Sequence, residues 1–174
     1  MKKLRSIPKI LKINEVEGYK VSCLFNNGES RIIDFREFFK GLKNYSKKHT
    51  AYRLMEDVNE FNQLEILGNT IGWKNVGIYS KNYIGEEVFY YYDLDPIVLF
   101  ENSKRDEERN LQIGLLVKKE RKKAGMTQKE LAKKSGTSKH YISRLENDKS
   151  DIELLTLKKI IEAGLGKELR INIA

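Results

Sequence analysis

The sequence lacks the features that mark secreted, membrane-spanning and zinc-binding proteins. It contains one cysteine, Cys23, so it can form neither an internal disulfide nor a cysteine-based zinc site. No apolar run in it approaches the roughly 18 residues that a membrane-spanning helix needs. The N-terminus, Met1–Pro8, is positively charged but has no apolar core of a secretory signal. We therefore expect a soluble, cytoplasmic protein with one domain or two small ones.

Positive charge is abundant and unevenly distributed. The 174 residues include 33 Lys and Arg against 25 Asp and Glu, a net charge of +8. Residues 1–103 carry 15 basic and 14 acidic side chains, whereas residues 104–174 carry 18 basic and 11 acidic ones. This division predicts a near-neutral domain over 1–103 and a basic domain over 104–174. Nucleic acid is the natural partner of the basic part, although a solvated basic surface explains the charge equally well.

The first domain has the pattern of an α+β fold with a mostly antiparallel sheet and short helices. Tyr19–Phe25 alternates apolar and polar residues, Asn26–Glu29 supplies a tight turn, and Arg31–Phe35 returns as a second strand. The other predicted strands are 7–13, 64–67, 70–73 and 88–92. The predicted helices are 36–42, 51–61 and a helix from Pro96 to about residue 103 that is capped by Asp95.

Residues 7–102 resemble a bacterial domain of unknown function, the family numbered 2442. The resemblance rests on the opening hairpin, on Trp73–Ile78 and on Asp93–Phe100, and it makes residues 80–90 an insertion. This family has no agreed activity, so the resemblance implies a fold and no chemistry.

Candidate catalytic groups are sparse in this domain. His49 has no second His or Cys nearby that would make a metal site, and the paired carboxylates Glu86–Glu87 and Asp93/Asp95 are also ordinary turn and cap residues. The aromatic run Phe89–Tyr92 favours a core or protein interface over base stacking. Cys23 shares an apolar strand face and is expected to be inert. We therefore predict no enzyme activity, no metal and no cofactor.

Beyond a polar segment at 102–110, predicted to be a solvated linker or a charged helical lead-in, the periodicity becomes helical. Ile113, Val117 and Ala124 share one face of a first helix that ends at Gly125. Thr127 and Glu130 form a capping box, Gly136 interrupts the chain, and Ser138 caps a third helix. A fourth helix is predicted over 153–163, and its inward residues are expected to be Leu154, Leu157, Ile160 and Ile161.

Met126–Ala132, Gly136–Ser138 and Tyr141–Asn147 resemble the phage-repressor-like (Cro/C1-type) helix-turn-helix family over about residues 111–165. The resemblance implies that residues 138–144 include a recognition helix that reads bases, while Gln128 fixes a phosphate. The implied DNA-binding residues are Gln128, Ser138, Lys139, His140, Ser143, Arg144, Asn147 and Lys149. It also implies a buried ion pair between Arg121 and Glu146, which would position the recognition helix.

The C-terminal tail alternates like a β-strand, with Leu169, Ile171 and Ile173 on one side. A single terminal strand needs a partner. It can pair within the chain or with a second copy, and its resemblance to the tails of helix-turn-helix antitoxins favours a homodimer. Such a dimer would read a palindromic operator in double-stranded DNA.

The sequence thus predicts a sequence-specific transcriptional regulator, associated with the nucleoid when bound to DNA. The favoured form is a repressor that serves as the antitoxin of a type II toxin–antitoxin pair and binds a cognate toxin through residues 1–103. The alternative is a repressor whose first domain senses a small ligand. A concave apolar pocket would favour the ligand sensor, and an exposed aromatic or sheet-edge surface would favour the protein partner.

Overall fold

The computed structural model describes residues 6–41, 49–149 and 151–172. The chain divides into two compact units, unit 1 over residues 1–110 and unit 2 over residues 111–174. Unit 1 is an antiparallel sheet domain with short helices and unit 2 is helical, so the α+β class predicted from the sequence is confirmed. The division falls after residue 110, whereas the sequence analysis placed it after residue 103.

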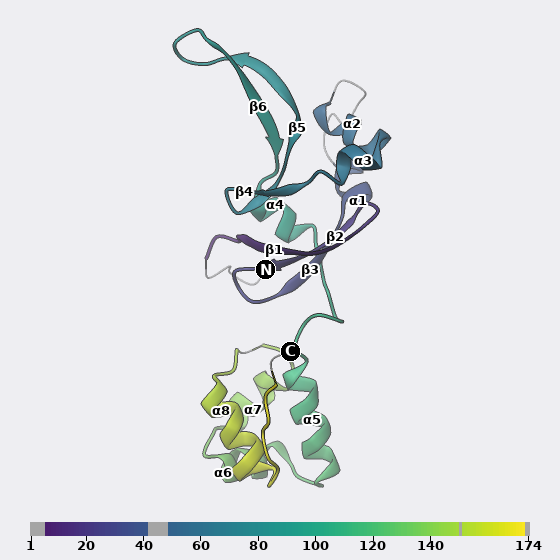
Figure 1. Ribbon diagram of the computed structural model, residues 1–174. Coiled ribbons are helices and arrows are strands. Elements are labelled where there is room, and N and C mark those ends of the chain that lie inside the picture. Colours follow the sequence, from purple (N-terminus) through teal and green to yellow (C-terminus); the bar gives the residue numbers. More distant parts are fainter. Residues whose placement is uncertain (1–5, 42–48, 150, 173–174) are drawn as a thin grey trace. The chain divides into compact units, whose positions relative to one another are not determined.

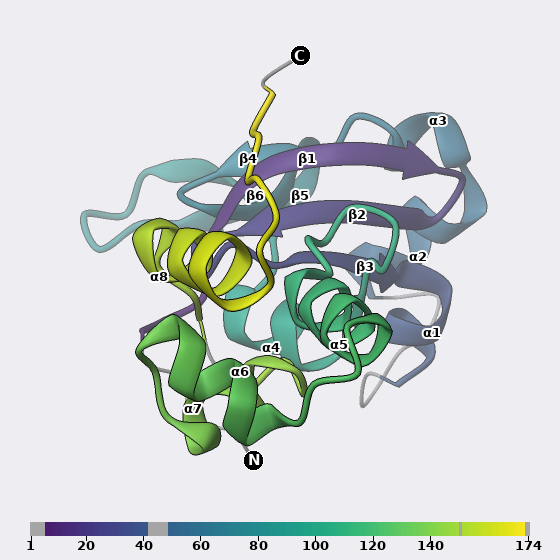
Figure 2. The same cartoon turned by 90° about the horizontal axis from the view of Figure 1, so that it is seen from below.

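Unit 1 contains two antiparallel sheets. The first has the strand order β1-β2-β3-β7, and Figure 2 shows β1, β2 and β3 side by side. Its strands are β1 (Ile10–Glu17), β2 (Lys20–Phe25), β3 (Ser30–Asp34) and β7 (Lys104–Arg105). As predicted, Val21, Cys23 and Phe25 point from β2 into the core and are fully buried. Burial raises the pKa of the Cys23 thiol to about 12, which keeps it in the unreactive form.

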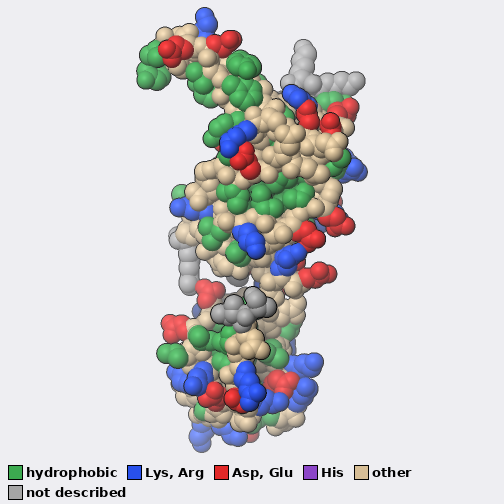
Figure 3. Space-filling model, viewed as in Figure 1, with side chains coloured by type: hydrophobic (Ala, Val, Ile, Leu, Met, Phe, Trp, Pro, Cys, Tyr) green, Lys and Arg blue, Asp and Glu red, His purple; other side chains and the backbone are tan. Residues whose placement is uncertain are grey.

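The second sheet has the strand order β4-β5-β6. Its strands are β4 (Glu65–Leu67), β5 (Thr70–Lys81) and β6 (Glu87–Asp93). Strand β5 continues well past the predicted end at residue 73, and with β6 it forms a hairpin that extends away from the rest of unit 1 (Figure 1). We call this hairpin, residues 77–91, the arm. Hydrophobic side chains lie along the arm and at its tip (Figure 3).

The core of unit 1 is centred on Trp73 of β5. Its indole Nε1 donates a hydrogen bond of 2.7 Å to the Phe61 carbonyl oxygen, so the ring's only polar group is satisfied although the side chain is fully buried. Phe35 and Phe61 pack against the indole, with ring centroids 5.7 and 5.6 Å away. This aromatic cluster holds the second sheet to the helices of unit 1.

The helices of unit 1 are short and begin at side-chain caps. They are α1 (Phe35–Lys40), α2 (Thr50–Glu56), α3 (Val58–Phe61) and α4 (Pro96–Glu101). The predicted Asp95 cap of α4 is confirmed, because its carboxylate accepts from the Ile97 and Val98 amides. The predicted continuous helix over 51–61 is wrong. Asp57 adopts an extended conformation and caps α3, which leaves Val58 exposed. Residues 42–48, which include the predicted end of the helix over 36–42, lie outside the described residues.

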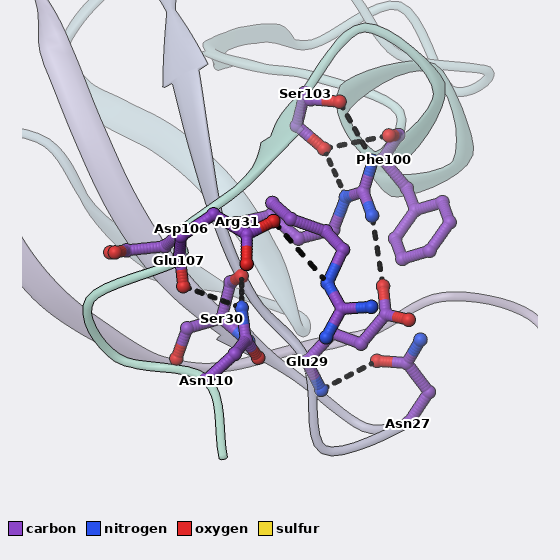
Figure 4. Close-up of polar contacts among 10 residues, drawn as sticks. Asn27, Glu29, Ser30, Arg31, Phe100, Ser103, Asp106, Glu107 and Asn110 are labelled. Atoms are coloured by element: carbon purple, nitrogen blue, oxygen red, sulfur yellow. Dashed lines mark hydrogen bonds and ion pairs between the residues drawn. The ribbon is translucent and has the colours of Figure 1, made fainter. Parts of the chain in front are cut away.

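Residues 104–110 form part of unit 1, and neither the predicted linker nor a helical lead-in is present (Figure 4). Arg31 of β3 donates from Nε and Nη2 to the Ser103 Oγ and carbonyl oxygen, each at 2.7 Å, while Asn110 hydrogen-bonds to both backbone groups of Ser30. The buried Asp106 carboxylate accepts from Ser22 Oγ at 2.5 Å. Strand β7 and these side chains fasten 104–110 to β2 and β3.

Unit 2 contains α5 (Ile113–Lys123), α6 (Gln128–Ser135), α7 (Lys139–Leu145), α8 (Leu154–Lys159) and the π-helical turn η1 (Ile160–Gly164). Its core gathers residues from all five elements: Val117, Leu131, Ala132, Ile142, Leu145, Leu157, Ile160 and Ile161 are buried together. Two inward residues were predicted wrongly. Ala124 lies at the exposed end of α5, and Leu154, in the first turn of α8, is more than half exposed.

The predicted C-terminal strand is not formed up to residue 172, where the described part of the chain ends. Residues 167–172 have no regular secondary structure. Leu169 is half-buried against the core of its own unit, Ile171 is 59% exposed, and Ile173 lies outside the described residues. Strand pairing by this tail would therefore need a second strand and a change in the tail's conformation.

Candidate nucleic-acid interface

Helices α6 and α7 form a helix-turn-helix whose turn is set by local sequence. The predicted capping box is present, since Thr127 Oγ1 accepts from the Glu130 amide and the Glu130 carboxylate accepts from the Thr127 amide. Gly136 ends α6 with φ of 64°, a left-handed conformation that suits glycine. Two residues later Ser138 caps α7, its Oγ accepting from the Tyr141 amide at 3.0 Å.

One face of α7 is buried, so the opposite face is fixed in position. Ile142 and Leu145 are buried in the core of unit 2, and Tyr141 is half-buried against it. The sequence left the orientation of Tyr141 open, and its packing places the ring on the core side. Lys139, His140 and Arg144 are exposed, and Ser143 is half-buried. These side chains, with the exposed Ser138 cap, form the outer face of the helix.

The turn after α7 is held by side-chain hydrogen bonds from the same face. Arg144 Nη2 donates to the Lys149 carbonyl oxygen at 2.9 Å, and Asn147 Nδ2 donates to the Ser143 carbonyl oxygen at 2.7 Å. Asn147 and Lys149 are exposed. Apart from Gln128, which lies at the start of α6, the predicted base-reading and backbone-contacting residues thus belong to one surface, which we call the α7 face: residues 138–140, 143–144, 147 and 149.

A buried ion pair connects α5 to the end of α7. Arg121 donates to Glu146 from Nε at 2.5 Å and from Nη2 at 2.8 Å, and the Glu146 side chain is 1% exposed. Burial acts to raise the pKa of the Glu146 carboxyl. The hydrogen bonds from Arg121 and Gln128, together with the charges of Arg121 and Lys118, outweigh burial and lower it. Glu146 is therefore ionised, and its charge is directed into the protein.

Gln128 takes part in this network. Its Nε2 donates to Glu146 Oε2 at 2.9 Å, and the side chain is half-buried at the start of α6. The sequence assigned Gln128 to a DNA phosphate, but the structure adds a contact inside unit 2. One carboxylate thus connects the first residue of α6, the last turn of α5 and the end of α7.

Gly114 contributes to the same arrangement and was not singled out from the sequence. A Cβ added at Gly114 would lie 2.2 Å from the Leu145 carbonyl oxygen, so α5 approaches the end of α7 as closely as a glycine permits. A glycine in the first turn of an otherwise helix-forming segment is the signal that could have revealed this contact.

The positive charge of the chain is concentrated in unit 2. Residues 111–174 carry 15 basic and 8 acidic side chains, a net charge of +7. Exposed lysines occur on α5, α6 and α7, among them Lys122, Lys133, Lys134 and Lys139. A surface of this sign attracts a polyanion over several ångströms without any sequence preference.

The described residues of unit 1 form an open depression and no cluster of metal ligands. One depression of about 600 Å³ is open and has a mainly polar and charged lining that includes Glu17, Lys20, Asp34, Arg36 and Glu56. His49 accepts a hydrogen bond from the Ala51 amide at the start of α2. Within the described residues, no three His, Cys, Asp or Glu side chains come together as a metal site. No helix among these residues is long and apolar enough to span a bilayer.

Comparison with known proteins assigns a family to part of unit 2. The helix-turn-helix family model matches residues 117–164, which contain α6, α7 and the Arg121–Glu146 pair. The restriction-modification controller protein C.Esp1396I is 33% identical over 33% of this chain and 73% of its own, with a TM-score of 0.32. NE0471 from Nitrosomonas europaea ATCC 19718, described as a candidate DNA-binding protein, is 9% identical over 88% of this chain and 84% of its own, with a TM-score of 0.33. No curated protein matches the chain significantly.

Proposed function

Because residues 117–164 carry a helix-turn-helix domain of the Cro/C1 type, we propose that this protein is a sequence-specific DNA-binding transcriptional regulator. The α7 face supports the proposal most directly. It brings Lys139, His140 and Arg144 to the outside of a capped helix whose other side is locked into a core. This is the geometry by which a recognition helix enters the major groove.

Each residue of the α7 face has a proposed role. Lys139 and Arg144 donate to guanine O6 and N7, and Ser138, His140 and Ser143 lie near base edges or phosphates. Asn147 and Lys149 of this face contact the DNA backbone, and so does Gln128, which lies outside the face at the start of α6. Glu146 reads no base, because Arg121 and Gln128 hold its charge away from the surface. The hydrogen bonds among Arg121, Gln128 and Glu146 hold α7 in a fixed orientation relative to α5 and α6.

Arg144 offers the sharpest test of base reading. The DNA site is first selected from a random duplex pool, and binding to the selected site and to random DNA is then measured. Arg144→Ala should reduce discrimination between the two by about 1–3 kcal/mol. Arg144→Lys keeps the charge but loses the paired donors, so it should also lose discrimination while keeping the dependence of affinity on salt. Unchanged discrimination in both variants would exclude a base-reading role for Arg144.

We further propose that the regulator acts as a homodimer on a palindromic operator, in line with a repressor. The tail residues Leu169, Ile171 and Ile173 are the contact proposed from the sequence. Removing residues 168–174 should then weaken dimerisation in sedimentation equilibrium, and an unchanged association constant would rule out the tail as a dimer contact.

The form of the regulator depends on what unit 1 binds. The open depression has a charged lining, whereas the arm exposes several aromatic rings at a sheet edge. These observations favour a protein contact over small-ligand sensing. An antitoxin bound to a cognate toxin is one such form. Co-expression with the neighbouring gene product tests it, since a stable complex that forms through unit 1 is expected.

A further inference from the structure

The arm exposes several aromatic and aliphatic side chains. Tyr83 is 97% exposed, Tyr79 70% and Phe89 36%, while Tyr90 and Tyr91 are nearly half exposed. At about 200 Å² for a fully exposed ring, these five rings expose roughly 600 Å². Ile78, Ile84 and Val88 add to this surface. This is the area of the whole arm, and the three rings on β6, those of Phe89, Tyr90 and Tyr91, supply roughly 250 Å² of it.

Both faces of the arm are apolar. Tyr79 lies opposite Phe89, with ring centroids 5.1 Å apart, and Ile78 lies opposite Tyr90 on the other face. A two-stranded ribbon is only marginally stable by itself in water. An arm of this composition is therefore expected to gain stability from a further strand.

Strand β6 is the outer strand of its sheet within the described residues, so one side of its backbone is available for pairing. Its sequence is Glu-Val-Phe-Tyr-Tyr-Tyr-Asp, with no lysine, arginine or proline. Natural edge strands usually carry such residues, which discourage pairing with other chains. Between Glu87 and Asp93 at its two ends, the five residues Val88–Tyr92 carry no charge and no proline, which marks this stretch of β6 as a pairing edge.

We propose that β6 pairs antiparallel with β6 of a second copy of this chain, around a two-fold axis at Phe89. In this register Val88 lies opposite Tyr90 of the copy, and Glu87 lies opposite Tyr91. Aromatic and β-branched residues in opposite positions are favourable cross-strand pairs. The register centred on Tyr90 is disfavoured, because it sets Glu87 opposite the copy's Asp93. The same patch contacts itself, as a closed dimer requires.

This inference does not depend on DNA binding, and cysteine pairing in the full-length chain tests it. In the proposed register Phe89→Cys places two thiols directly opposite each other, within the Cα separation that a disulfide spans. Diamide, which takes up the two hydrogens as the disulfide forms, should yield a covalent dimer. Cys23 is fully buried and does not compete.

Cysteine variants at other positions show whether crosslinking is specific to the β6 edge. Tyr79→Cys lies opposite Phe89 but on the inner strand β5, so edge pairing predicts little crosslinking there. Val58→Cys is an equally exposed control outside the arm, at 37% against 36% for Phe89. If Phe89→Cys disturbs the arm, a mixture of Val88→Cys and Tyr90→Cys should crosslink faster than either protein alone. Equal crosslinking at positions 58, 79 and 89 would overturn the proposed pairing.

Sedimentation equilibrium provides the second measurement. In the chain without residues 168–174, where the tail cannot contribute, Phe89→Lys should raise the dissociation constant for self-association at least tenfold, whereas Val58→Lys should leave it unchanged. A chain that stays monomeric at every concentration would overturn the proposal and leave the arm to a different protein partner.

Discussion

Glu146 illustrates how one residue orients the candidate recognition helix. It is buried, ionised and hydrogen-bonded to side chains from two other helices. Replacing it leaves the Arg121 guanidinium buried without its counter-ion, which costs far more than the net gain from the pair itself.

Glu146→Ala should therefore lower the free energy of unfolding of unit 2 by about 3–5 kcal/mol. The double replacement Arg121→Met with Glu146→Met should recover most of this loss, because it leaves no buried charge. Urea unfolding of both variants is followed by far-UV circular dichroism, which reports on the helices of unit 2. Tryptophan fluorescence does not serve here, because the only tryptophan, Trp73, lies in unit 1. A double variant as unstable as Glu146→Ala would contradict this account.

Glu120 makes the stability of unit 2 depend on pH. Its ion pairs with Lys167 and then Lys123, at 2.7 and 2.9 Å, lower the pKa of its carboxyl from 4.5 to about 2. A depressed folded-state pKa gives a contribution that is complete above pH 4.5 and is lost as the pH falls towards 2. The free energy of unfolding of the unsubstituted protein, measured at a series of pH values, should fall over this range. The fall should be smaller in Glu120→Gln. Identical pH profiles would mean that Glu120 does not contribute.

At the scale of elements, local motifs were predictable and long-range pairing was not. The caps at Asp95, Thr127 and Ser138 follow from side chains two or three residues from their targets, and all three are present. The break at Asp57 was missed because one residue leaves the helical conformation within an otherwise helical pattern.

The strand predicted over 88–92 is confirmed as β6, but the extension of β5 beyond residue 73 and strand β7 were missed. Residues 77–91 pair along the hairpin without a core face, so no apolar periodicity marks their length. The residues of the candidate site were predicted more completely than the arm, from a family resemblance and not from local patterns. The α7 face and the Arg121–Glu146 pair came from resemblance to a family, because no local pattern connects residues 25 positions apart.

The segment 104–110 carries a prediction at this scale. Asp106→Ala removes the buried acceptor of the Ser22 hydroxyl, so unit 1 should lose about 1–3 kcal/mol of stability. Trp73 fluorescence during urea unfolding measures this change, and trypsin should cut faster at Lys104 and Arg105. Glu108→Ala is an exposed control that should change neither. Equal trypsin rates in both variants would contradict the role of Asp106.

At the scale of the whole molecule, the separation of charge predicts that lysines of unit 2 contribute to DNA affinity and that lysines of unit 1 do not. Lys122→Gln in unit 2 should weaken binding to specific and random DNA alike and reduce the salt slope by about one. Lys40→Gln, an exposed change in near-neutral unit 1, should alter neither. Fluorescence anisotropy over a range of salt concentrations measures both slopes. A larger effect from Lys40 would mean that unit 1 also contacts DNA.

The fastening of residues 104–110 to β2 and β3 also limits how this gene can be rearranged. A recombination that joined another protein directly after codon 103 would transfer unit 1 without Asp106 and Asn110, and therefore without the groups that bond to Ser22 and Ser30. A crossover after codon 110 would keep every one of these bonds. The module that evolution or a protein engineer can exchange intact thus ends at Asn110, immediately before the helical unit begins.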